Sequence, residues 1–340
     1  MPNPIQSTFP LGAPPWPTFD PFLFCVHHRD AYPAGDEQMG PAASLAGRNI
    51  GQDFANIDGW NMYHGDAVPG FPSHPHRGFE TITLARRGYI DHSDSLGAKA
   101  RFGEGDVQWM TAGKGIVHSE MFPLVKRDAP NPTELFQIWI NLPAADKMVD
   151  PYFTMMWSKD IPRKVVHDAN NRVSEVTMVA GAFDGDTAPA PPPNSWASRS
   201  DAGVAVWAIR MAAGADLVLP AAVAGLNRTL YAFEGGAMQV GGTMVRSGTG
   251  VRLHSDQPVT LSNGDQPAEL LLLQGRPIAE PVAKYGPFVM NTRGELQQAF
   301  EDYQRTRFGG WPHGRNDPTH DRDSTRFAVH ADGRRETPTT

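Results

Sequence analysis

Short runs of apolar or alternating residues recur along the chain, separated by segments rich in glycine and proline. In the run 135–140, Leu135, Gln137 and Trp139 alternate with three apolar neighbours, which is the pattern of a β-strand with two buried faces. Shorter runs lie at 81–84, 107–110, 176–179, 204–207 and 270–273. Many short strands with glycine-rich turns are typical of a sandwich or barrel. The pattern therefore predicts an all-β fold.

One segment near the C-terminus has helical periodicity instead. Apolar residues repeat at helical spacing over 296–303, and Thr292 followed by Glu295 has the spacing of a capping box. The glycine pair 309–310 should end this short helix. The tail 311–340 is charged and shows no periodicity, so we expect either a coil draped over the protein or disorder.

Composition and charge narrow the classes of function. The chain has 340 residues, which suggests two domains, and its formal net charge is −7. This acidic balance argues against direct nucleic-acid binding, which needs clustered positive charge. The N-terminus lacks the pattern of a signal peptide, and the most apolar long stretch, 203–226, contains Arg210 and Asp216. We expect a cytoplasmic protein that does not insert into a membrane.

The chain has a single cysteine, Cys25. One cysteine excludes an intramolecular disulfide and any metal site built from several thiolates. Cys25 lies in the apolar run 22–26, so we expect a buried structural thiol rather than a nucleophile.

A faint internal repeat suggests how the strands are organised. Three glycines with the same two spacings occur twice, as Gly97, Gly103 and Gly105 and as Gly242, Gly248 and Gly250. Glycines at fixed offsets mark equivalent tight turns, so the repeat predicts two similar β-barrels in tandem. We place the N-terminal barrel at residues 1–150, the C-terminal barrel at 151–290, and the helix and extended tail at 291–340.

Two short motifs carry the most informative chemistry, His74-Pro75-His76 and His118-Ser119-Glu120. On a strand, residues i and i+2 face the same side, with their Cα atoms roughly 6.5–7 Å apart. If the intervening residues form antiparallel hairpins, the two motifs meet across a barrel interior. They then present three imidazoles and one carboxylate to one metal ion, with coordination positions left open. Separate surface or core histidines are the less favoured alternative.

The ligand types indicate which metal such a site would hold. Imidazole binds Zn, Cu, Fe and Ni, and an added carboxylate with open positions is typical of non-haem Fe(II) oxygenases. Iron is the first choice, while Cu, Ni, Co and Mn stay open. If the strand continues, Glu80 shares a face with His74 and His76 and competes with Glu120 as ligand, or orients a histidine. Pro75 cannot donate to a sheet, which predicts an edge or irregular strand.

Four longer segments carry a family-specific pattern. They are HPHRGFETITLARRGYIDHSDSLGAKARFGEGDVQWMTAGKGIVHSEMFP (74–123), DPFLFCVHHRD (20–30), GWNMYHG (59–65) and GRPIAEPVAKYGPFVMNTRGELQQAF (275–300). In these segments the chain resembles the pirin family. The resemblance implies a bicupin, two tandem cupin barrels of the jelly-roll type, with one iron ion in the N-terminal barrel.

The same resemblance implies a ligand set and an activity. The family's ligands fall on His74, His76, His118 and Glu120, although the general cupin motif places a glutamate ligand at Glu80. Members are associated with quercetin 2,3-dioxygenase activity, in which O2 opens the ring of a flavonol and carbon monoxide leaves. The implied substrate is therefore a flavonol or another small phenolic compound. We expect Glu120 to act as the general base that takes the proton of the flavonol hydroxyl.

Two other functions stay open. Some family members are regarded as iron-dependent partners of transcription factors, so the alternative is a redox-sensing regulator that binds a protein partner without turnover. A third possibility is a closed zinc site that only stabilises the fold.

The remaining candidates are interpreted as structural. In the second copy of the repeat, the ligand offsets fall on residues that cannot form the same set, so we expect a C-terminal barrel without metal: Ala222, Ala224, Asn263 and Asp265. His92 lies in the polar segment 91–94, where we expect a solvated turn. Trp109, Met110 and Phe71 are large enough to line a cavity, but such residues more often form the core.

Overall fold

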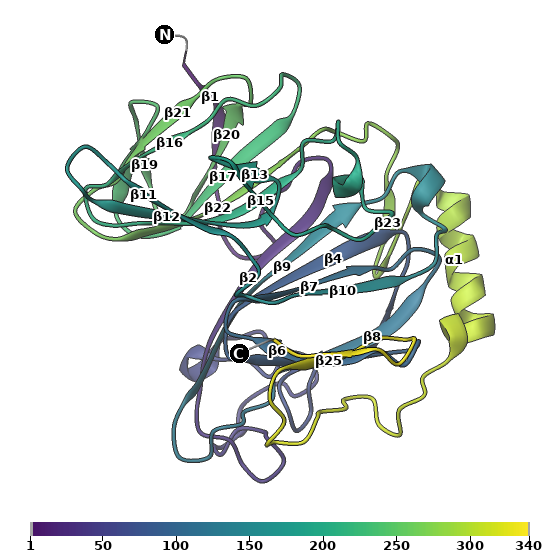
Figure 1. The fold of residues 1–340 in the computed structure, drawn as a ribbon. Helices are drawn as coiled ribbons and strands as arrows, with labels where there is room; N and C mark the ends of the chain where they lie inside the picture. Colours follow the sequence, from purple (N-terminus) through teal and green to yellow (C-terminus); the bar gives the residue numbers. More distant parts are fainter. Residues whose placement is uncertain (1–2, 339–340) are drawn as a thin grey trace. The chain divides into compact units, whose positions relative to one another are not determined.

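The computed structural model describes residues 3–338, which form two compact units built mainly from strands (Figure 1). Val26–Ser158 and the chain from Glu280 onward form one unit, the N-terminal barrel. Lys159–Ala279 and the stretch that ends at Cys25 form the other, the C-terminal barrel. The all-β prediction with two barrels is confirmed.

The N-terminal barrel consists of two antiparallel sheets. Their strand orders are β10-β7-β4-β9-β2 and β26-β25-β6-β5-β8-β3. The strands are β2 (Phe22–Tyr32), β3 (Gly70–His76), β4 (Phe79–Arg87), β5 (Tyr89–Asp94), β6 (Lys99–Gly103), β7 (Asp106–Thr111), β8 (Ile116–Met121), β9 (Asn131–Asn141), β10 (Tyr152–Met156), β25 (Phe327–Val329) and β26 (Arg335–Glu336). Because side chains alternate across a strand, one face of each sheet turns inward, and Ile90, Phe102 and Leu135 pack there.

The C-terminal barrel repeats this arrangement. Its sheets have the orders β1-β20-β17-β22-β15-β12-β11 and β16-β21-β18-β19. The strands are β1 (Ile5–Pro10), β11 (Arg163–His167), β12 (Val173–Ala180), β15 (Ala205–Met211), β16 (Asp216–Leu219), β17 (Asn227–Glu234), β18 (Ala237–Val240), β19 (Thr243–Arg246), β20 (Thr249–His254), β21 (Val259–Ser262) and β22 (Ala268–Gly275). The order β20-β17-β22-β15 corresponds to β7-β4-β9-β2, and β16-β21-β18-β19 corresponds to β3-β8-β5-β6. The shared order confirms the internal repeat.

The remaining elements are short. They are the strand pairs β13 (Ala182–Phe183) with β14 (Asp186–Thr187) and β23 (Ala283–Tyr285) with β24 (Phe288–Met290), and the 3-10 turns η1 (Ile57–Gly59), η2 (Ala144–Asp146), η3 (Trp196–Ser198) and η4 (Arg307–Gly309).

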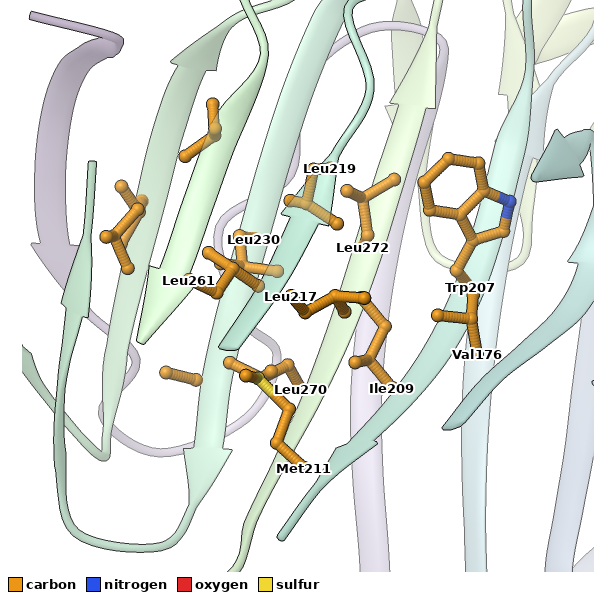
Figure 2. Packing of buried hydrophobic residues seen from close by; sticks show 14 of the residues in the cluster. Val176, Trp207, Ile209, Met211, Leu217, Leu219, Leu230, Leu261, Leu270 and Leu272 are labelled. Carbon is orange, nitrogen blue, oxygen red and sulfur yellow. The ribbon is translucent and has the colours of Figure 1, made fainter. Parts of the chain in front are cut away.

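The interior of the C-terminal barrel is apolar (Figure 2). Strands β16 and β21 correspond to β3 and β8, and they pair Leu217 with Leu261 where the N-terminal barrel pairs His74 with His118. The offsets counted along the sequence therefore pointed to the wrong positions. The reason is that residues 220–226 connect β16 to β17, whereas only residues 77–78 connect β3 to β4. A C-terminal barrel without metal stays a prediction.

The predicted C-terminal helix is confirmed as α1 (Arg293–Thr306). The Thr292 hydroxyl accepts the Glu295 N–H, and the Glu295 carboxylate accepts the Thr292 N–H at 2.7 Å, which completes the capping box. Leu296 and Ala299 bury the inner face of the helix beside Phe288. The helix thus belongs to the core of the N-terminal barrel unit.

The tail after α1 is a draped coil over the residues that the structure describes. Its strand β25 pairs with β6, and Ala328 is buried in the barrel core. At the other end of the chain, β1 pairs with β20. These two pairings explain why the units differ from the division at residues 150 and 290. Each barrel is extended at one edge of a sheet by strands from a distant part of the sequence: β25 and β26 in the N-terminal barrel and β1 in the C-terminal barrel.

Two further expectations concern Cys25 and the membrane. Cys25 is fully buried, and burial raises the pKa of its thiol well above the usual range, which agrees with a structural role. Among residues 3–338, no helix has the length and apolar character needed to cross a bilayer.

Candidate metal centre

Three histidines meet on neighbouring strands of the N-terminal barrel. His74 on β3 pairs directly with His118 on β8, and His76 follows on the same face of β3. One ring nitrogen from each histidine lies within 4.8 Å of the other two. His76 and His118 are buried and His74 is half-buried. The sequence prediction that the two motifs converge is therefore confirmed for the histidines.

Backbone carbonyls orient two of the rings. The Nδ1 atom of His74 lies 2.8 Å from the Pro72 carbonyl oxygen, and Nδ1 of His76 lies 3.4 Å from that of Pro287. A carbonyl only accepts hydrogen bonds, so each Nδ1 carries the hydrogen and each Nε2 keeps a free lone pair. An imidazole held in this way is the usual form of a metal ligand.

The third ring supports the same interpretation. His118 is completely buried, and neither of its nitrogens has a hydrogen-bond partner within residues 3–338. Burial and the neighbouring imidazoles lower the pKa of His118 and His76 well below the usual value, and burial lowers that of His74 to about 4. All three rings are therefore neutral at pH 7, as a metal requires. The residues present fit a transition-metal ion.

Glu120 lies on the same face of β8 as His118, but its carboxyl is occupied elsewhere. Thr83 Oγ1 lies 2.8 Å from Glu120 Oε1 and 2.7 Å from Gln137 Oε1, and Gln137 Nε2 lies 3.4 Å from Glu120 Oε2. One hydroxyl hydrogen cannot serve two acceptors. Thr83 therefore donates to the Glu120 carboxyl or to the Gln137 amide oxygen at any one time, and burial raises the pKa of Glu120 while the hydrogen bond from Thr83 lowers it. Its role as fourth ligand stays a prediction.

Glu80 does not share the face of the histidines. The strand that carries His74 ends at His76, and Glu80 belongs to the next strand, β4. Between them, Gly78 has φ 85°, and a Cβ there would lie 1.9 Å from the Val289 carbonyl oxygen. Glu80 pairs with Thr111, whose hydroxyl donates to it at 2.6 Å, whereas Thr83 faces the opposite side. The condition for a shared face is therefore not met, because the strand is interrupted at residues 77–78 and β4 belongs to the other sheet.

The irregular edge predicted from Pro75 is confirmed. Strand β3 is the last strand of its sheet, and its register with β8 shifts between Phe71 and His74. The free edge lets Pro75 lie within the strand without losing a hydrogen bond.

His92 is a functional candidate that the sequence interpretation missed. It lies in strand β5, is completely buried, and pairs with Glu120 on β8. Its ring centroid is 5.5 Å from that of His118, and its Nε2 lies 3.2 Å from an Asp94 carboxylate oxygen. The predicted solvated turn is wrong, because the segment is a strand between β6 and β8 and the His92 ring stacks on Phe153 of the other sheet. The i, i+2 spacing of His92 and Asp94 was the available signal.

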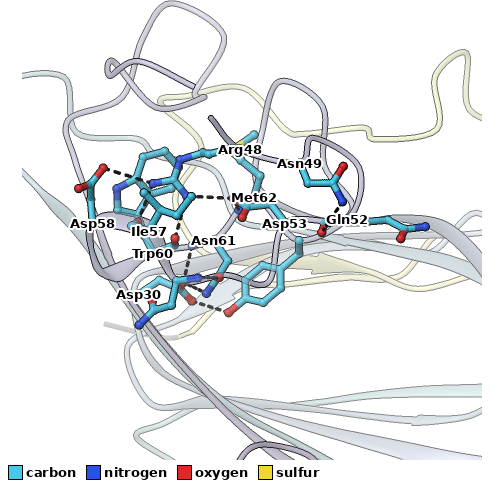
Figure 3. Close-up of polar contacts among 12 residues, drawn as sticks. Asp30, Arg48, Asn49, Gln52, Asp53, Ile57, Asp58, Trp60, Asn61 and Met62 are labelled. Atoms are coloured by element: carbon cyan, nitrogen blue, oxygen red, sulfur yellow. Dashed lines mark hydrogen bonds and ion pairs between the residues drawn. The ribbon is translucent and has the colours of Figure 1, made fainter. Parts of the chain in front are cut away.

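A buried polar network holds the loop that leads into β3 (Figure 3). Arg48 forms an ion pair with Asp53 at 2.9 Å, and both side chains are almost fully buried. The Tyr63 hydroxyl donates to Asp30 at 2.7 Å, and the Tyr63 ring stacks on Phe71 with centroids 5.1 Å apart. The network therefore fixes the start of the strand that carries two of the histidines.

Fold and site together define a class of protein, a bicupin with three histidines arranged for a metal in its N-terminal barrel. Residues 17–140 match the model of the pirin family, and residues 206–309 match that of the pirin C-terminal cupin domain. The chain belongs to the pirin family.

Similar proteins cover both barrels. A Pseudomonas aeruginosa protein named "Putative quercetin 2,3-dioxygenase" is 37% identical over 239 residues, which cover 70% of this chain and 79% of that protein. A pirin-like protein of Solanum lycopersicum is 34% identical, with coverage of 78% and 87%. The crystal structure of a quercetin 2,3-dioxygenase from Acinetobacter baumannii has a TM-score of 0.68 at 27% identity, with coverage of 91% and 96%.

Proposed function

We propose that this protein is an iron-dependent dioxygenase that opens the ring of a quercetin-like flavonol with O2 and releases carbon monoxide. The observation that carries the proposal is the convergence of three neutral histidines, two buried and one half-buried, within 4.8 Å, on the strand face that also carries the buried Glu120. The relatives named as quercetin 2,3-dioxygenases support the same reaction.

In this proposal His74, His76 and His118 hold the iron and leave coordination positions open. The metal, when bound, supplies positive charge that lowers the pKa of a coordinated hydroxyl and of the neighbouring carboxyl. His74 and His76 stay in one tautomer because their Nδ1 hydrogens are bound to carbonyl oxygens. The protein thus contributes a preorganised set of lone pairs.

Glu120 acts as the general base. An ionised Glu120 accepts the proton of the flavonol hydroxyl, and hydrogen bonds from Thr83 and Gln137 hold its carboxyl in place. Because burial raises the pKa of Glu120, its carboxylate is a stronger base than an exposed one.

The test is a turnover assay. Protein loaded with Fe(II) under anaerobic conditions is mixed with quercetin and O2, and carbon monoxide is measured against flavonol consumed. We expect one carbon monoxide for each quercetin. Carbon monoxide absent from fully loaded protein would contradict the proposal and favour the regulatory alternative.

A pair of variants tests the base. Glu120→Gln should lower kcat by about 100-fold or more, which is the usual contribution of a general base. Glu80→Gln is the matched control, because Glu80 is also buried but lies on the face of β4 opposite to Thr83, which contacts Glu120. Equal loss of activity in both variants would contradict a specific role of Glu120. Loss of iron in Glu120→Gln would identify Glu120 as a ligand instead.

A further inference from the structure

Three side chains form one row on the inner face of the five-stranded sheet, and two of them contact Glu120. In the register of β7, β4 and β9, Gln108 and Gln137 both pair with Thr83, one on each side. Directly paired residues point to the same face of a sheet. Thr83 and Gln137 both reach Glu120. Gln108 therefore faces the same interior.

The two glutamines of this row differ in their hydrogen bonds. Gln137 is bonded through both ends of its amide, to Thr83 and to Glu120. Gln108 is completely buried, yet within residues 3–338 neither its Oε1 nor its Nε2 has a partner. Buried amides in native proteins are nearly always bonded, and leaving one unbonded is costly. The Gln108 amide is thus free to bind a molecule that enters the barrel.

Other polar atoms of this interior are unbonded as well. Thr81 lies two residues before Thr83 on the same face of β4, and its hydroxyl has no partner in the described chain. Nδ1 of His92 is also buried without a partner, and the His92 ring stacks on Phe153 with centroids 5.2 Å apart and planes 26° apart. Unbonded polar atoms beside a stacked pair of rings suit a flat ligand that carries oxygens.

We propose that Gln108 is a substrate-binding residue that recognises a hydroxyl and a carbonyl oxygen side by side on a flat ring. This inference rests on the proposed dioxygenase function. An amide presents an acceptor and a donor in one plane, so Oε1 accepts from the hydroxyl while Nε2 donates to the carbonyl oxygen. In a flavonol, Glu120 takes the proton of the hydroxyl on one side of the carbonyl. The hydroxyl on the other side of the carbonyl, at position 5 of quercetin, is then the donor to Gln108 Oε1.

The experiment compares quercetin with fisetin, which lacks the 5-hydroxyl. Binding of each to the Fe(II)-loaded protein is measured anaerobically by titration calorimetry. The wild type should bind quercetin about 10- to 100-fold more tightly than fisetin, because fisetin leaves a buried acceptor unbonded. Gln108→Met should bind both weakly and with little preference, while keeping its iron.

The possible failures are distinguishable. If the wild type binds neither flavonol, the proposed function is wrong, and this inference falls with it. If Gln108→Met keeps the wild-type preference for quercetin, the inference alone is overturned.

Thermal stability separates substrate binding from a structural role. Gln274→Met is the matched control, because Gln274 is a buried glutamine of the C-terminal barrel that is bonded to Arg228 and to the Gly203 carbonyl. Gln274→Met should lower Tm and leave the preference for quercetin intact. Gln108→Met should not lower Tm, since no hydrogen bond within the protein is lost. If Gln108→Met unfolds, or lowers Tm as much as the control, the amide is structural and the inference is wrong.

Discussion

The tail of the N-terminal barrel is anchored by one buried ion pair, so replacing Arg101 should release it. The Arg101 guanidinium donates to both carboxylate oxygens of Asp91 at 2.7 Å, and both side chains are at most 1% exposed. It also donates to the carbonyl oxygens of His320, Asp321 and Ser324 at 3.0, 2.8 and 3.2 Å. One side chain therefore links β5 and β6 to the tail.

Arg101→Met should cost about 4 kcal/mol of unfolding free energy. The main reason is that Asp91 is left as a buried charge without its partner, a situation that typically costs about 3–5 kcal/mol. In the double variant Arg101→Met/Asp91→Leu no charge is stranded, so the loss should fall to about 1 kcal/mol. The second substitution should therefore restore about 3 kcal/mol of the stability lost in Arg101→Met.

Amide hydrogen exchange is the appropriate assay because it reports on the N-terminal barrel separately. The protection of backbone amides in β6 reports the stability of the barrel. The protection of backbone amides in Phe327–Val329 reports the stability of the tail. Both variants should expose the tail, while only the single variant should destabilise β6 strongly. A loss below about 1 kcal/mol in Arg101→Met, or an equal loss in the double variant, would refute the reasoning.

Three further predictions concern buried groups. Burial raises the pKa of Asp30 to about 6, so the folded protein binds more protons than the unfolded chain between pH 4 and 6. The free energy of unfolding should therefore fall by about 3 kcal/mol as pH rises through this window. Denaturant titrations of Asp30→Asn should lack this fall. Cys25 should react with a thiol reagent only after unfolding, so labelling of the native protein would show that its burial is wrong. Lys147→Met should destabilise the N-terminal barrel by about 3 kcal/mol, because Lys147 Nζ donates to the Gly78 carbonyl and to Asn141 at 2.8 and 2.7 Å. Unchanged protection of the backbone amides of this barrel in hydrogen exchange would contradict this.

Local patterns in the sequence predicted much of the fold and the histidine site. The alternation at 135–140 lies within β9, and the capping box at Thr292 begins α1. The pairs His74/His76 and His118/Glu120 each share one strand face, which depends only on the two-residue period of a strand. Features that depend on a few consecutive residues could therefore be predicted.

Features that depend on distant pairing could not be predicted. His92 lies in the middle of a sheet between β6 and β8, and its ring stacks on Phe153 of the other sheet, so its burial depends on contacts between residues that are distant in the sequence. Gln108 and Gln137 both pair with Thr83, yet only Gln137 has hydrogen-bond partners in the described chain, Thr83 and Glu120. The bonding state of a buried polar group is a property of the assembled barrel.

The central claim is that His74, His76 and His118 bind one metal ion, and metal stoichiometry tests it most directly. Wild type, His118→Ala and His254→Ala are loaded with Fe(II) anaerobically, freed of excess metal and measured by elemental analysis. His254 is the control, because it lies on β20 of the C-terminal barrel. The account predicts one iron per chain in the wild type and in His254→Ala, and little iron in His118→Ala. Equal iron in all three proteins, or none in the wild type, would contradict it.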